Sequence, residues 1–149
     1  MNKDEILIAL SQSDWTKFGK EDFALQSFPQ KVFSSVWAVE SEVNNGGFLQ
    51  YFLNSTAETA AFVADALETI GAPKTADICR RAIESAFPNG LPSTPEGNSS
   101  LVAELSEDTL AQLDALDTEF FGYPHDLTEL LYAYVSRHPQ EFGTVPHPS

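Results

Sequence analysis

Apolar residues recur along this chain at the three-to-four-residue spacing of amphipathic helices, and no segment shows the period-2 alternation between turns that marks strands. The first helical pattern covers residues 3–18, and Gly19 is expected to end it. Its apolar face contains Ile6, Leu7, Leu10, Trp15 and Phe18. The pattern as a whole predicts an all-α fold, a single compact bundle of about six to seven helices over residues 1–142.

A second helix is expected to begin at Pro29, because the first turn of a helix does not need the N–H that proline lacks. Its broad apolar face contains Val32, Phe33, Val36, Trp37, Val39 and Val43. Asn and Gly tolerate the left-handed backbone that closes a helix, so the run 44–47 predicts a break. A short aromatic helical turn is expected over residues 48–53.

Ser55 followed by Glu58 has the spacing of a capping box, which predicts that the third helix starts there and runs to Gly71. Its buried stripe would contain Phe62, Val63, Ala66, Leu67 and Ile70. The same reasoning predicts a helix over residues 74–86, with Ala76, Cys79, Ala82, Ile83 and Ala86 inward.

The C-terminal part begins with turn-forming residues at 88–98, so we expect a surface loop near 88–100. Two further helices are predicted near 106–120 and 125–137 from their leucine and aromatic spacing. Residues 143–149 contain two prolines and are expected to form a flexible tail.

Composition fits one folded domain, because 149 residues with 42% apolar content can bury a substantial core. Asp and Glu number 22 against 8 Lys and Arg, which gives a net charge of −14. Direct binding to nucleic acid or to an anionic membrane is therefore not expected, since both need clustered Lys and Arg. An electrostatic partner should be basic.

The expected location is cytoplasmic. No run approaches the ~20 apolar residues of a membrane span, and acidic residues precede the first short apolar run. The lone cysteine, Cys79, cannot form an internal disulfide, which fits a reducing compartment.

Negative charge is concentrated in the stretch 82–136, which has ten acidic residues and no Lys or Arg. Residues 107–119 alone contain five carboxylates, which on a helix is about one per 4 Å, close to the phosphate spacing of about 3.4 Å along one DNA strand. One helix cannot reproduce both phosphate rows of a duplex, so a mimic would need several helices or a dimer. The alternative is that these acids only solvate the outer faces of helices.

Patterns for catalysis, metals and cofactors are sparse, and no cofactor or metal site is predicted. His125 and Glu129 are four residues apart, but two ligands do not make a metal site. Arg80 adjoins Cys79, whose place on an apolar stripe nevertheless favours a core residue over a nucleophile. Gly46 and Gly47 lack the Lys-Ser/Thr of a phosphate loop; their amides can form an anion nest, although a turn between helices is the simpler interpretation.

The segment 44–55 reads NNGGFLQYFLNS. It resembles the signature of the bacterial DNA-mimic protein family of the Neisseria type, a domain-of-unknown-function family, because Asn, Gly, aromatic and Gln positions agree together. The resemblance implies an all-α domain that can dimerise. In the named member it implies an acidic surface that occupies the DNA-binding site of a transcription regulator.

We interpret the motif itself as structural. Its members are Asn45, Gly46, Gly47, Phe48, Gln50, Tyr51, Phe52 and Asn54. The three aromatic residues fall at i, i+3 and i+4 and should anchor the turn in the core, while the Asn and Gln side chains should hydrogen-bond backbone around it. A small-ligand or catalytic site in the Asn45–Asn54 region, with Glu40 and Glu42 as nearby acids, is the alternative.

The leading hypothesis is a non-enzymatic acidic protein that occupies the nucleic-acid-binding surface of a basic DNA-binding protein, or binds another basic protein, and that can form a homodimer. Part of the binding face is predicted to be Glu104, Glu107, Asp108, Asp114, Asp117 and Glu119. One alternative is an immunity-type inhibitor of a basic toxin or nuclease, which would also bind through attraction between its acids and a basic partner. Another is a small-molecule-binding protein or enzyme using the Asn45–Asn54 region.

Overall fold

The computed structural model describes residues 1–12 and 22–148, and the regular secondary structure in these residues is entirely helical. The α-helices are α1 (Lys3–Ser11), α2 (Phe28–Leu53), α3 (Val63–Thr69), α4 (Pro73–Ala86), α5 (Pro95–Val102), α6 (Glu107–Phe121), α7 (Leu127–Ser136) and α8 (Pro139–Phe142). Two short 3-10 helices are η2 (Phe23–Leu25) and η3 (Ser55–Thr59). The all-α prediction is confirmed, with more helices than expected because η2, α5 and α8 form where no helix was predicted and the segment 55–71 divides into η3 and α3.

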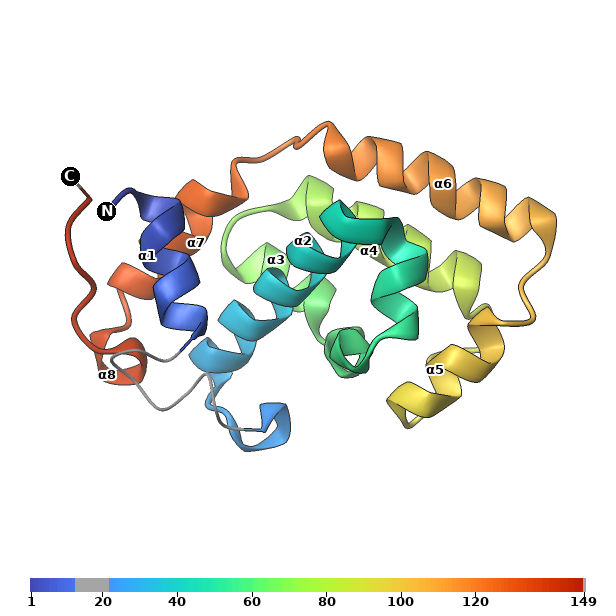
Figure 1. Ribbon diagram of the computed structural model, residues 1–149, viewed down its shortest axis with the longest axis horizontal. Coiled ribbons are helices and arrows are strands. Elements are labelled where there is room, and N and C mark those ends of the chain that lie inside the picture. Colours follow the sequence, from blue (N-terminus) through green and yellow to red (C-terminus); the bar gives the residue numbers. More distant parts are fainter. Residues whose placement is uncertain (13–21, 149) are drawn as a thin grey trace.

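Helix α2 runs through the middle of the molecule, and α6 lies along one of its long sides. Helices α1, α7 and α8 gather with both termini at the left end of the view (Figure 1). Aromatic side chains of α2 hold the neighbouring helices against it. The Phe48 ring meets Phe120 of α6 edge-on at 5.8 Å between centroids, and Phe52 meets Phe87 at 5.1 Å. The core therefore forms around α2, and α6 is fixed to it.

The predicted break lies inside α2, at Gly46 and Gly47, whose backbone angles are not helical. Gly47 has φ of 77°, a left-handed value that favours glycine. The two parts of α2 therefore point in different directions. The start of α2 also follows its sequence signals, because Ser27 and Gln30 form a capping box and Pro29 occupies the first turn.

The expected continuous helix from Ser55 to Gly71 is wrong. Residues 55–59 form η3 and α3 begins only at Val63, although Val63, Ala66, Leu67 and Ile70 are buried as predicted. The hydroxyl of Tyr51 hydrogen-bonds that of Thr59, and Ala57 and Ala60 are buried. Packing of η3 back onto α2 therefore overrides the local capping signal.

The loop expected near 88–100 instead contains α5. The Thr94 hydroxyl accepts a hydrogen bond from the Gly97 amide at 3.1 Å, so Thr94 is the N-cap and Pro95 follows it in the first helical turn. The residues interpreted as turn formers are thus a helix start.

The tail expected to be flexible is docked over part of its length. The Tyr132 hydroxyl donates to the Pro146 carbonyl at 2.9 Å, and Val145 packs against the core.

At the N-terminus, α1 has an Asn2–Glu5 capping box and ends at Ser11. Trp15, Phe18 and Gly19 of the expected first helix lie outside the described residues. In the part of the chain that the structure describes, no helix is long and apolar enough to cross a bilayer.

Candidate functional site

The exposed acids of α6 lie on two flanks of the helix. Its buried side carries Leu113, Leu116 and Phe120. At about 100° per residue, Glu107 and Asp114 fall on the flank toward α2, and Asp108 and Glu119 fall on the flank toward α4. Glu104 lies just before the helix and is exposed.

Four of the six predicted binding acids are exposed and make no ion pair within the described residues: Glu104, Glu107, Asp108 and Asp114. Since no cation neutralises them, their charges are available to a partner. The other two are engaged within the protein.

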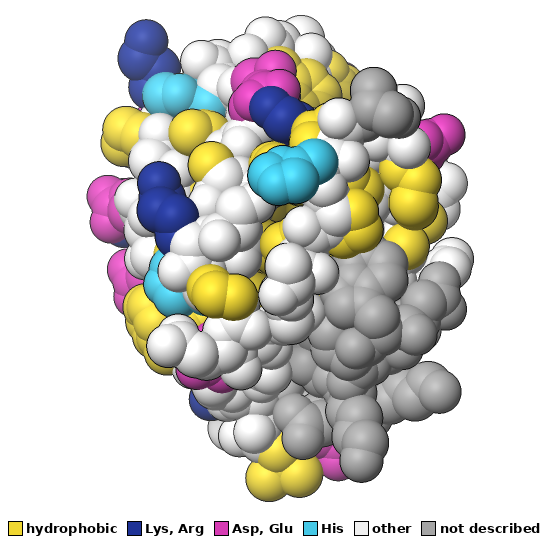
Figure 2. Space-filling model, turned by 90° about the vertical axis from the view of Figure 1, so that its left-hand side faces the viewer, with side chains coloured by type: hydrophobic (Ala, Val, Ile, Leu, Met, Phe, Trp, Pro, Cys, Tyr) yellow, Lys and Arg dark blue, Asp and Glu magenta, His cyan; other side chains and the backbone are white. Residues whose placement is uncertain are grey.

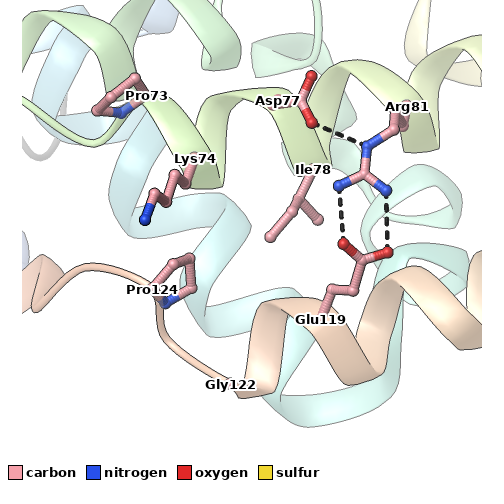
Figure 3. A pocket seen from close by; sticks show the side chains of 8 residues that line it. All are labelled: Pro73, Lys74, Asp77, Ile78, Arg81, Glu119, Gly122 and Pro124. Atoms are coloured by element: carbon pink, nitrogen blue, oxygen red, sulfur yellow. Dashed lines mark hydrogen bonds and ion pairs between the residues drawn. The ribbon is translucent and has the colours of Figure 1, made fainter.

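Glu119 is held by a cation of α4. Arg81 donates from Nη1 and Nη2 to its two carboxylate oxygens at 2.9 and 2.8 Å, and from Nε to Asp77 at 2.9 Å (Figure 3). The paired guanidinium lowers the pKa of Glu119, and the two carboxylates raise the pKa of Arg81. Glu119 is therefore a bridge between α4 and α6 rather than a free charge.

This bridge closes one end of a groove of about 560 Å³ between α4 and α6. Ile78 lies between the bridge and the other end, where Lys74 and Pro124 stand (Figure 3). A second groove, of about 680 Å³, shares Arg81 and Glu119 and continues toward Glu84 and Thr109.

Asp117 caps the second part of α2. Its Oδ1 accepts a hydrogen bond from the Phe48 amide at 2.8 Å, immediately after the break at Gly47. Burial raises the pKa of Asp117, while the Phe48 amide opposes that shift. Asp117, one of the six acids predicted to bind a partner, is therefore engaged within the protein, where this half-buried carboxylate does for the restarted helix what an N-cap side chain usually does.

The polar motif residues contact a side chain rather than backbone. Glu42 accepts hydrogen bonds from Asn54 Nδ2 and, at 3.4 Å, from Gln50 Nε2. The expected backbone bonds are wrong for these two residues, whereas Asn45 is exposed. Phe48, Tyr51 and Phe52 are all fully buried. The motif thus surrounds the kink, and Glu42 is the hydrogen-bond acceptor for two of its side chains.

Glu40 has a separate partner. Tyr123, whose φ is 44°, donates from its hydroxyl to Glu40 at 3.3 Å and accepts from Asn44 Nδ2 at 2.7 Å. Burial raises the pKa of Glu40. Together these bonds join the first part of α2 to the C-terminal end of α6.

The residues considered for a metal site, His125 and Glu129, bind different partners, and Cys79 is buried. His125 Nε2 accepts from the Lys74 amide at 3.2 Å, while Glu129 pairs with Lys3 at 2.6 Å. No group of three metal-ligating side chains occurs among the described residues. Cys79 is buried, which raises its pKa to about 12.

Charge differs between the two ends of the molecule. The end with α1, α7 and α8 shows Lys, Arg and His side chains among apolar and acidic ones (Figure 2). Residues 32–73 and 82–136 contain no Lys or Arg, and they supply most of α2 together with α3, α5, α6 and α7. The acidic side of α6 is thus built from elements without cations.

A family model described as DMP19-like protein matches residues 25–138, which include α2 with its kink, η3 and α6. Neither the curated proteins nor the solved structures give a match. Since the family model spans well over half of the chain, the chain belongs to the DMP19-like protein family.

Proposed function

We propose that this protein binds a basic DNA-binding protein by presenting carboxylates where the phosphates of DNA would lie, and that it is not an enzyme. The observation that carries this proposal is the set of four exposed, unpaired acids on and before α6: Glu104, Glu107, Asp108 and Asp114. No Lys or Arg occurs in the stretch 82–136 that contains them.

The arrangement on α6 supports the proposal. Its carboxylates leave the helix on two flanks, and a helix with its side chains is about 10–12 Å across. Because Glu119 on the flank toward α4 is paired with Arg81, the free carboxylates of α6 supply one row of phosphate-like charges, and a second row must come from another helix or a second copy. Mimicry of DNA is also the role associated with the DMP19-like family.

An enzyme or small-molecule site in the Asn45–Asn54 region has less support. The side chains of Gln50 and Asn54 already bind Glu42, and Tyr51 is buried and bonded to Thr59. The two grooves between α4 and α6, and a third of about 140 Å³ beside η3, are lined by residues outside this segment. These contacts favour a structural role for the motif.

The test starts with capture of partners from an extract of the source cells, followed by release with rising salt and by competition with duplex DNA. The identified partner is then purified and its affinity measured for E107Q/D108N/D114N. Loss of three charges should weaken binding by tenfold or more and slow association, because exposed charges steer encounter and are screened beyond about 8 Å at physiological salt.

The matched control is D4N/D22N/E58Q, which removes the same charge from exposed acids on α1, before η2 and on η3. It should bind within about twofold of the wild type. Far-UV circular dichroism checks that both variants fold. Equal binding by both variants, or binding that is unchanged between low and high salt, would contradict the proposal. A toxin or nuclease as the captured partner would instead identify an immunity-type inhibitor.

A further inference from the structure

One face of α6 carries two acidic residues between two exposed apolar residues. Leu110, Asp114, Asp117 and Phe121 fall at i, i+4, i+7 and i+11, so they form a single stripe, here called the α6 stripe, about 16 Å long. Leu110 is 38% exposed and Phe121 48% exposed. The stripe thus offers two large apolar side chains, one at each end, with carboxylates between them.

The second part of α2 adds apolar surface next to the stripe. The bond from the Phe48 amide to Asp117 fixes the stripe beside this part of α2, where Leu49 and Leu53 are partly exposed. Farther along, the Ser99 hydroxyl donates to the Leu53 carbonyl at 3.1 Å and so ties α5, with its exposed Leu101, to the C-terminal end of α2.

The charges of these elements determine what can cover the stripe. Residues 32–73 and 82–136 supply carboxylates but no Lys or Arg, and Arg81 neutralises Glu119 on the opposite flank of α6. A second copy docked here about a two-fold axis would place Glu107 and Asp114 against the same residues of its partner. Like charges at close range oppose such an interface, so the occupant must supply the cations.

We infer that the α6 stripe binds an amphipathic basic helix, in which apolar side chains pack on Leu110 and Phe121 while flanking Lys or Arg side chains pair with Glu107 and Asp114. This inference rests on the proposed function and deepens it. Binding then has two components, a charge component that salt weakens and an apolar component that salt does not weaken.

The experiment uses two synthetic probes of equal charge. One is a helical Leu/Lys peptide with leucines at i, i+3 and i+4 spacing, and the other carries Ser in place of Leu. The Leu/Lys peptide should bind about tenfold more tightly, because two half-exposed side chains become buried. In NMR titrations it should shift amide signals of the α6 stripe and of residues 49–53.

Three variants separate the components. L110S/F121S should reduce the advantage of the Leu/Lys peptide to less than about threefold while leaving binding of the Ser/Lys peptide unchanged. E107Q/D114N should weaken both peptides. I8S/L25S, which removes exposed apolar side chains from α1 and η2, is the matched control and should change neither.

Equal affinity for the two peptides, or a full Leu/Lys advantage in L110S/F121S, would overturn the inference. So would sedimentation showing a wild-type dimer that L110S/F121S converts to a monomer, since the stripe would then be a self-interface. Failure of the proposed function looks different: E107Q/D114N would bind both peptides as well as the wild type does.

Discussion

Gly47 lies close to the carboxylate of Asp117 at the kink. A Cβ atom built on Gly47 would lie 2.3 Å from Asp117 Oδ2, and the φ of 77° independently disfavours any other residue. The same carboxylate accepts from the amide of the next residue, Phe48. Glycine here therefore permits both the backbone turn and the approach of the carboxylate that caps it.

We expect Gly47→Ala to lower the free energy of unfolding by about 3–5 kcal/mol, because backbone strain adds to the loss of a partly buried hydrogen bond. The control is Gly90→Ala, at a φ of 98° with nothing within 4 Å of the added Cβ, which should cost only about 1–2 kcal/mol. Urea unfolding followed by circular dichroism measures both. If both variants lost the same free energy of unfolding, the contact with Asp117 would add nothing to the cost of replacing Gly47.

Cys79 gives a second prediction for a single residue. Its burial and its raised pKa, about 12, leave almost no thiolate at neutral pH. The native protein should therefore react with a thiol reagent such as dithionitrobenzoate only at the rate of unfolding, and completely in urea. Rapid reaction of the folded protein would contradict the buried placement.

Between elements, Glu40 joins α2 to the end of α6 through its bond with Tyr123, and its burial makes stability depend on pH. Burial raises the pKa of Glu40 above its ordinary 4.5, so the folded state holds a proton that the unfolded state has released. Stability from this group therefore falls as pH rises from 4.5 through the folded pKa. Glu40→Gln should gain stability relative to the wild type, and the gain should be larger at pH 7 than at pH 4.

Glu68→Gln provides a comparison of opposite sign. Arg80 lowers the pKa of Glu68, so its contribution is present above 4.5 and is lost as pH falls through the lower folded value. This variant should therefore lose stability relative to the wild type at pH 7 and recover it in acid. Unfolding experiments between pH 4 and pH 7 measure the stability of each variant relative to the wild type. If this difference changed with pH in the same direction for both variants, the opposite pKa shifts of Glu40 and Glu68 would be contradicted.

The spacing of apolar residues was sufficient to predict most helices, because the residues of an apolar stripe are the ones that the helix buries. The break at Gly46–Gly47 was also predictable, since glycine marks it locally. The roles of Asp117 and Glu119 were not, although the two carboxylates look alike in sequence. Their partners, Phe48 and Arg81, lie 69 and 38 residues away along the chain, and only the packing of α6 on α2 and α4 brings them together.

At the scale of the whole molecule, a net charge of −14 disfavours the compact state through self-repulsion. We expect salt to stabilise the protein, with a gain on the order of 1 kcal/mol, or about 2–4 °C in Tm, between low and high sodium chloride. E107Q/D108N/D114N should show a smaller rise in calorimetry. A Tm that does not change with salt, or equal slopes for the variant and the wild type, would argue against clustered repulsion on α6.

The uneven distribution of cations also determines where the protein can be labelled. All five lysines, at positions 3, 17, 20, 31 and 74, precede α5 and α6 in the chain. Amine-reactive dyes, biotin or sensor surfaces will therefore modify no side chain of α5 or α6, although Lys74 lines the groove between α4 and α6. Trypsin has no cleavage site between Arg81 and Arg137, so a protease specific for glutamate is the better choice for mapping that region.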